Sequence, residues 1–205
     1  NPFSGKKDKE DRTETLSLWA KVMAGVIPAA LVGFLFEEQI DKLFYNPITV
    51  ASALIIYGVL FIILENRKNK PTVNNLSELS YKTAFLIGAF QILALIPGTS
   101  RSGSTILGAV LLGTSRYIAA EFSFFLAVPI VFGASGLKLL KYGFDFSGAE
   151  AAVLITGLIV AFIVSVYAIK FLLNYIKKHD FKAFGYYRII LGIVVLAYFL
   201  FANSK

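Results

Sequence analysis

The chain has 205 residues, of which 57% are hydrophobic and only 16% are charged, and its mean hydropathy is +0.70. Soluble domains carry about 25% charged residues, so this composition excludes an ordinary water-soluble domain and indicates a membrane protein. The net charge of +7 does not indicate nucleic acid binding, because the basic residues lie in short segments beside apolar runs, which is typical of membrane topology and anionic lipid.

Five apolar runs are long enough to cross a bilayer as helices, since a helix rises about 1.5 Å per residue and the hydrocarbon core is about 30 Å thick. These runs cover residues 16–36, 48–64, 118–137, 151–173 and 186–202. No hydrophilic stretch between them is large enough for a separate soluble domain. We therefore predict one all-α transmembrane domain, a polytopic helical bundle over residues 1–205, with kinks at Pro28 and Pro129.

Two shorter apolar pieces, residues 84–96 and 102–112, flank a polar segment rich in glycine, serine and threonine. Neither piece can cross the bilayer alone. A short apolar helix, a polar break and a second short helix are typical of a re-entrant hairpin, which is tolerated at depth only where it lines a cavity or is buried in protein. We predict such a hairpin over about residues 84–112.

The distribution of basic residues supports this hairpin, because Lys and Arg accumulate on the cytoplasmic side of membrane proteins. Four basic residues occur in each of three segments, residues 1–15, 65–82 and 174–188, the last of which ends at Arg188. Fewer occur in residues 37–47 and 138–150. Placing the three rich segments on one face requires residues 84–115 to enter and leave the membrane on that face.

The polar segment, residues 97–105, is a candidate anion site. Placing Arg101 near mid-depth costs about 2.5–3.5 kcal/mol on insertion scales, so it needs a partner. A phosphate group suits it, because a guanidinium stays charged and offers two parallel donors. Gly98 and Gly103 permit close approach of the backbone, and the following helix directs its N-terminal amides at the ligand. Hydroxyl groups come from Thr99, Ser100, Ser102, Ser104 and Thr105.

Such a cradle favours the charge that develops during phosphoryl transfer. The alternative interpretation is that the small residues only allow close helix packing and that Arg101 pairs with an acidic side chain. His179 is the only histidine and lies in a basic loop, so we expect a solvated residue rather than a catalytic base. We expect Glu121, near the start of a span, to have a structural role.

Residues 90–105 (FQILALIPGTSRSGST) resemble the second signature of bacterial undecaprenyl pyrophosphate phosphatases, the family linked to bacitracin resistance. Residues 113–117 (GTSRY) and 121–129 (EFSFFLAVP) are also similar to this family. The resemblance implies a polytopic enzyme of the bacterial inner membrane, built from inverted repeats with two re-entrant hairpins. Such an enzyme removes the terminal phosphate of undecaprenyl pyrophosphate and recycles the lipid carrier for cell-wall synthesis.

The resemblance also implies roles for individual residues. Arg101 holds the pyrophosphate and is expected to be catalytic together with Ser100 and Thr105. The expected substrate-binding residues are Gly98, Thr99, Ser102, Gly103 and Ser104. Whether water or a serine attacks the phosphorus stays open.

The family's first signature, two glutamates spaced four apart followed by a Pro-x-Ser-Ser-x-Gly-His stretch, does not occur in residues 1–205. Glu37 and Asp41 have similar spacing but lack that context. We expect the first signature to lie upstream of Asn1. The resemblance implies a divalent cation, Mg²⁺ or Ca²⁺, and we assign no metal ligand within this chain.

The expected partners are an isoprenoid pyrophosphate lipid and membrane lipids, with a second copy of the chain as a further candidate and no nucleic acid. Two other functions use the same features. A transporter or flippase would bind an anionic headgroup at a broken helix without cleaving it. A non-catalytic membrane scaffold is the third hypothesis, and it leaves the cost of Arg101 unexplained.

Overall fold

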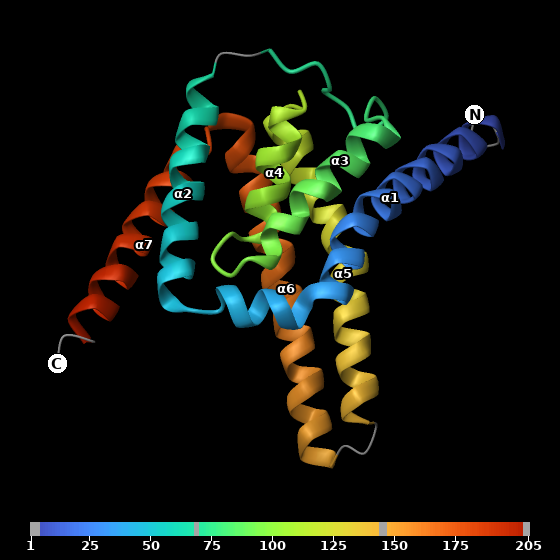
Figure 1. The fold of residues 1–205 in the computed structure, drawn as a ribbon. Coiled ribbons are helices and arrows are strands. Elements are labelled where there is room, and N and C mark those ends of the chain that lie inside the picture. Colours follow the sequence, from blue (N-terminus) through green and yellow to red (C-terminus); the bar gives the residue numbers. More distant parts are fainter. Residues whose placement is uncertain (1–4, 68–69, 144–146, 203–205) are drawn as a thin grey trace.

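The structure, a computed structural model, describes residues 5–67, 70–143 and 147–202 (Figure 1). These described residues form seven α-helices and one short 3₁₀-helix. In chain order these are α1 (Gly5–Phe44), α2 (Pro47–Asn66), α3 (Tyr81–Ile92), η1 (Leu93–Leu95), α4 (Arg101–Leu111), α5 (Arg116–Tyr142), α6 (Gly148–Lys178) and α7 (Lys182–Ala202). Within the described residues the only β pairing is an isolated bridge between Val73 and Thr114.

In the part of the chain that the structure describes, five helices are long and apolar enough to cross a membrane, namely α1, α2, α5, α6 and α7. The prediction of an all-α polytopic membrane protein is therefore confirmed. α1 is much longer than the apolar run 16–36, because lysines and glutamates continue a helix beyond its apolar part. Figure 1 shows that α1 changes direction past its middle, as expected for a helix that contains Pro28.

The two short helices α3 and α4 pack against each other, with α4 also against α2 and α5 (Figure 1). Serine side chains cap both helices: Ser80 accepts a hydrogen bond from the Thr83 amide, and Ser100 accepts one from the Gly103 amide. The chain turns between η1 and α4 within five residues, 96–100. This is the shape expected for the hairpin, and its re-entry into the bilayer stays a prediction.

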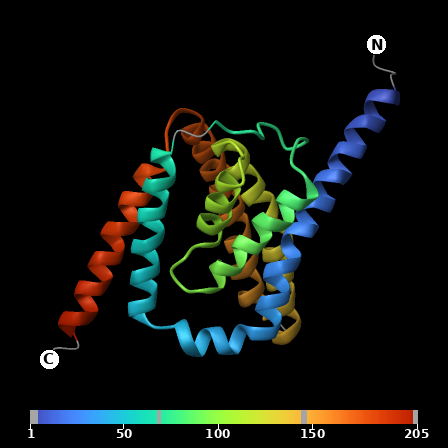
Figure 2. The ribbon, with the colours of Figure 1, turned by 45° about the horizontal axis from the view of Figure 1, so that its top comes forward.

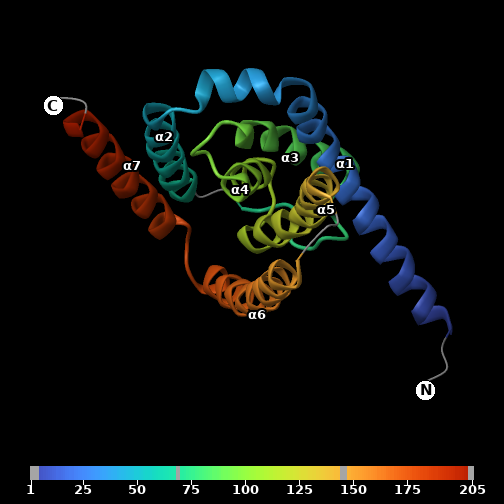
Figure 3. The same ribbon diagram turned by 90° about the horizontal axis from the view of Figure 1, so that it is seen from below.

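The helices form two groups around α4. In Figures 1 and 2, α2 and α7 lie side by side, while α1 packs against α3 and α5. Figure 3 shows α4 inside a ring formed by the longer helices. α6 contributes little to the interior, since none of its most apolar stretch is buried within the chain.

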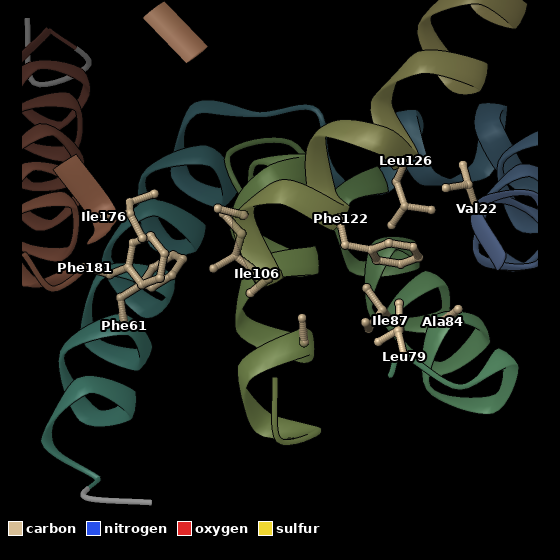
Figure 4. Packing of buried hydrophobic residues seen from close by; sticks show 13 residues of the cluster. Val22, Phe61, Leu79, Ala84, Ile87, Ile106, Phe122, Leu126, Ile176 and Phe181 are labelled. Atoms are coloured by element: carbon tan, nitrogen blue, oxygen red, sulfur yellow. The ribbon is translucent and has the colours of Figure 1, made fainter. Parts of the chain in front are cut away.

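The buried core runs through this arrangement in two parts (Figure 4). On one side Phe61 of α2 packs against Phe181, with ring centroids 5.7 Å apart, and Ile176 lies beside them. On the other side Phe122 and Leu126 of α5 face α1 and α3. Together these contacts hold α4 at a fixed depth between α2 and α5.

Candidate active site

A cavity of about 500 Å³ lies beside the N-terminal end of α4. Four residues of the predicted polar segment line it: Gly98, Ser100, Ser102 and Gly103. Most of the remaining wall is apolar and comes from α2, α4, α5, α6 and α7, including Leu54, Phe61, Ile106, Phe124, Leu172 and Phe184. The cavity thus combines a polar end with an apolar body, which is typical of a site for a ligand with a polar head.

The turn that leads into α4 has an unusual backbone. Gly98 has φ +90°, and a Cβ at this position would collide with the backbone carbonyl of Val50 in α2. Ser100 has φ +69° although it is not glycine, a conformation that costs of order 1–3 kcal/mol and is often found at functional sites. The hairpin follows the segment after the C-terminal end of α2, whereas Val50 lies in the N-terminal half of that helix. The turn of the hairpin therefore lies beyond the middle of α2.

Ser100 directs the amide end of α4 at the cavity. Its hydroxyl lies 3.3 Å from the Ser102 hydroxyl and accepts a hydrogen bond from the Gly103 amide, also at 3.3 Å. The first amides of a helix have no intrahelical partner, and the helix dipole adds partial positive charge there. The cavity therefore meets amides and two hydroxyls, an arrangement that suits an anion.

Arg101 and Thr105 meet at Ser123 of α5. Arg101 Nη1 donates to the Ser123 carbonyl oxygen at 3.2 Å, and the Thr105 and Ser123 hydroxyl oxygens are 2.7 Å apart. The Thr105 hydroxyl also lies within hydrogen-bonding distance of the carbonyl oxygens of Arg101, at 3.0 Å, and Ser102, at 3.2 Å, and either of the two hydroxyls can be the donor between Thr105 and Ser123. Ser123 lies in residues 121–129, which resemble the family, but the sequence alone predicted no role for it.

A second guanidinium lies at the site. Arg188 of α7 is 9% exposed, and its Nη2 donates to the carbonyl oxygens of Gly98 at 2.8 Å and Thr99 at 2.5 Å. Arg188 Nη1 packs so closely on Gly103 that a Cβ atom at position 103 would lie only 2.6 Å from it. The guanidinium also lies 5.8 Å from the centre of the Tyr57 ring. Its Nε has no hydrogen-bond partner within the described residues.

This position corrects the interpretation of Arg188 as the last basic residue of a cytoplasmic loop. α7 begins at Lys182, so Arg188 lies inside a spanning helix, and its side chain turns toward the hairpin. An arginine inside a membrane span is a functional candidate by the same reasoning that selected Arg101. Because Arg188 lies within the apolar run 186–202, the sequence alone could have identified it as a functional candidate.

The structure separates the predicted site residues into two sets. Gly98, Ser100, Ser102 and Gly103 line the cavity. Thr99, Ser104 and Thr105 are buried behind it, where Ser104 Oγ contacts the Ser100 carbonyl at 3.3 Å and the Tyr57 hydroxyl at 3.5 Å. The Arg101 side chain is half-buried and is not among the residues that line the cavity, although it contacts the lining residue Ser123. The arginine in the lining is Arg188. Over the described part of the chain, Arg101 forms no ion pair with an acidic side chain.

The residues of this site do not fit a divalent cation by themselves. Across the described ranges there is no group of three or more His, Asp or Glu residues that could hold a metal ion. His179 is exposed and stacks on Tyr175 at 4.4 Å, away from the hairpin. Glu121 lies on α5 beside Tyr117 and Lys177.

Comparisons with known proteins agree with the resemblance seen in the motifs. The family described as bacitracin resistance protein BacA matches residues 1–194. The chain is 63% identical to the undecaprenyl-diphosphatase of Acetivibrio thermocellus over 201 residues, which cover 97% of this chain and 74% of that protein. It is 61% identical to undecaprenyl-diphosphatase 1 of Clostridioides difficile over 199 residues, 97% of this chain and 73% of the relative. For the undecaprenyl-diphosphatase of Enterococcus faecalis the identity is 54% over 207 residues, with shares of 98% and 75%.

Proposed function

Because this chain belongs to the bacitracin resistance protein BacA family, we infer that it hydrolyses undecaprenyl pyrophosphate to undecaprenyl phosphate and inorganic phosphate. The reaction returns the lipid carrier to cell-wall synthesis. The family and the five apolar helices among the described residues indicate a multi-pass protein of the bacterial membrane. The observation that carries the proposal is the amide and hydroxyl end of α4, which lies beside a cavity with largely apolar walls.

The two parts of the cavity correspond to the two parts of the substrate. The pyrophosphate would meet the hydroxyls of Ser100 and Ser102 and the first amides of α4. Arg101, which contacts the carbonyl of the lining residue Ser123, would neutralise a phosphate oxygen from beside the lining. The isoprenoid tail would lie against apolar side chains such as Phe124 and Leu172. Thr105 contacts no cavity space and acts through Ser123, so its proposed contribution is to position Arg101.

Arg188 has a different task from Arg101. Two of its hydrogen bonds go to carbonyl oxygens of the turn, so it fixes the backbone that presents Ser100. Its positive charge also offsets those carbonyl dipoles, which would otherwise repel an incoming phosphate. We therefore assign Arg188 a positioning role with a long-range electrostatic contribution.

In the reaction, an oxygen nucleophile attacks the terminal phosphorus, and the bond from that phosphorus to the bridging oxygen breaks. Undecaprenyl phosphate leaves with the electron pair of that bond. With water as the nucleophile the product is inorganic phosphate directly, and with a serine hydroxyl a phosphoserine would first form and then be hydrolysed. The amides of α4 and Arg101 would stabilise the charge on the transferred group, which is the main task of a phosphoryl-transfer site.

A divalent cation, Mg²⁺ or Ca²⁺, is part of the proposal. It would neutralise phosphate charge and polarise the phosphorus–oxygen bond. Since the described side chains offer no cluster that would hold it, no step above is assigned to it. Association of two copies of the chain is a further part of the proposal, which light scattering in detergent would test.

Phosphate release by the purified full chain, supplied with undecaprenyl pyrophosphate and Mg²⁺, tests the function. We expect turnover, and we expect Arg101→Ala to abolish it while Arg12→Ala, at an exposed position of α1, leaves it intact. Substrate binding without phosphate release would instead identify a carrier of the lipid headgroup. Intact turnover in Arg101→Ala would remove the proposed role of that residue.

A further inference from the structure

A second, larger cavity of about 830 Å³ lies at the other end of the hairpin, where α2, α4 and α6 end and α5 begins. It shares only Ile176 with the cavity described above. Four basic residues line it, Arg67, Lys70, Arg116 and Lys177, together with the single acidic residue Glu65. The segments that contribute these residues are among those predicted to face the cytoplasm.

The acidic residue does not neutralise this lining. The Glu65 side chain is 2% exposed and is already used, since it pairs with Arg116 and accepts a hydrogen bond from the Phe181 amide at 3.1 Å. Four cations and one carboxylate leave the lining with a net charge of +3. Arg67 is exposed and forms no ion pair within the described ranges. Lys177 lies over the Tyr117 ring at 4.7 Å, and Glu121 offsets part of its charge.

Two further features of the same wall suit an anion. α5 is 27 residues long and begins at Arg116, so its first amides and the positive end of its dipole lie at this cavity. Thr114, just before that helix, is 2% exposed, and its hydroxyl has no hydrogen-bond partner in the part of the chain that the structure describes. An unpaired buried hydroxyl costs about 1–3 kcal/mol, so a partner at this position is expected.

We propose that this cavity binds the phosphate-bearing headgroup of an anionic membrane lipid, separately from the catalytic site. A lipid fits better than a free phosphate ion, because the cavity is far larger than one phosphate and part of its wall is apolar, including Leu64, Val110 and Leu111. It also lies at the ends of three apolar helices, where headgroups are found. Basic pockets between helices on the cytoplasmic side are known to select such lipids.

Native mass spectrometry of the full chain, titrated with phosphatidylglycerol or with phosphatidylcholine, tests the proposal independently of phosphatase activity. We expect retained phosphatidylglycerol and little phosphatidylcholine. Arg67→Gln and Lys177→Gln should each weaken phosphatidylglycerol binding about fivefold, as expected for one basic residue near the headgroup. The matched controls are Lys82→Gln and Lys178→Gln, exposed lysines outside the lining, which should change nothing.

Thr114→Val tests whether the unpaired Thr114 hydroxyl binds the lipid headgroup or has no ligand partner. We expect weaker phosphatidylglycerol binding without any loss of thermal stability of the lipid-free protein, because valine removes a hydroxyl that contacts no described protein group. Equal retention of the two lipids, or equal effects of the lining and control lysines, would overturn the proposal. Saturable binding of inorganic phosphate that displaces no lipid and is weakened by Arg67→Gln would assign the cavity to the free ion and also overturn it.

Discussion

Arg188 Nη2 lies 2.8 Å from the carbonyl oxygen of Gly98, although the two residues are 90 positions apart in the chain. This contact ties the last spanning helix to the turn of the hairpin. Because Gly98 also packs on the backbone of Val50 in α2, the turn is held from two sides. These contacts fix the backbone of the turn, so Ser100 keeps its strained conformation and its position in the cavity wall.

Arg188→Lys should lower kcat much more than it changes KM. A lysine keeps the charge, but its side chain is one bond shorter, so its ammonium does not reach the position of Nη2, the nitrogen that donates to both carbonyls. We expect a loss of about tenfold or more, since one misplaced positioning group costs at least 1.4 kcal/mol. Steady-state phosphate release gives the split. Partial rescue of Arg188→Ala by added guanidinium would support the positioning role, whereas a fall in thermal stability with unchanged kcat would contradict it.

Arg101→Gln should reduce kcat/KM by about 10²–10³, the usual effect of removing one donor that stabilises a transition state. Stability should change little, because within the described residues the Arg101 side chain makes one hydrogen bond, to the Ser123 carbonyl. Phosphate release and thermal unfolding in detergent would measure both effects. A variant that unfolds early but turns over at the wild-type rate would show that Arg101 is structural.

Thr105→Val should destabilise the protein by about 1–3 kcal/mol, because it leaves the buried Ser123 hydroxyl without its hydrogen-bond partner. The matched control is Thr114→Val, which is equally buried but removes a hydroxyl that has no partner among the described residues. Thermal unfolding of the two variants compares them directly. Equal melting temperatures would show that the Thr105–Ser123 contact contributes nothing to stability.

Gly98→Ala should destabilise the hairpin and abolish activity. Its φ of +90° is unfavourable for alanine, and the added Cβ would collide with the Val50 carbonyl, so the turn has to move away from α2. Gly133→Ala in α5 is the control, because a Cβ there meets nothing within 4 Å. The control should gain about 0.5–1 kcal/mol from better helix propensity. Wild-type turnover in Gly98→Ala would show that the turn geometry is not needed.

Chelation with EDTA should stop phosphate release, and added Mg²⁺ should restore it. The cradle around Arg101 supplies positive charge and hydrogen-bond donors, and the proposed cation supplies the remaining neutralisation of the pyrophosphate. Turnover that survives exhaustive chelation would remove the cation from the proposal without affecting the roles of Ser100 and Arg101. Substrate binding measured in parallel would show whether the cation acts in binding or in the chemical step.

Local features of the sequence were sufficient for much of the fold. A run such as residues 151–173 has to be a spanning helix, because a bilayer leaves no other way to satisfy its backbone. The hairpin followed from the short apolar pieces on either side of Pro97, and the anion cradle followed from the cost of placing Arg101 among them. These inferences depend only on residue types close together in the chain, so a single sequence is enough to make them, and the re-entry of the hairpin and the anion cradle stay predictions.

The tertiary structure alone decided which groups meet. Arg188 lies within the predicted span 186–202, but only the structure shows that its side chain contacts the turn at Gly98. Ser123 joined Thr105 and Arg101 only through the rotation of α5 against α4, and that rotation also placed Ser102 at the cavity and Ser104 behind it. The physical reason is that hydropathy fixes how long a helix is and roughly where it lies in the membrane. Its rotation and its neighbours depend on side-chain packing between segments far apart in the chain.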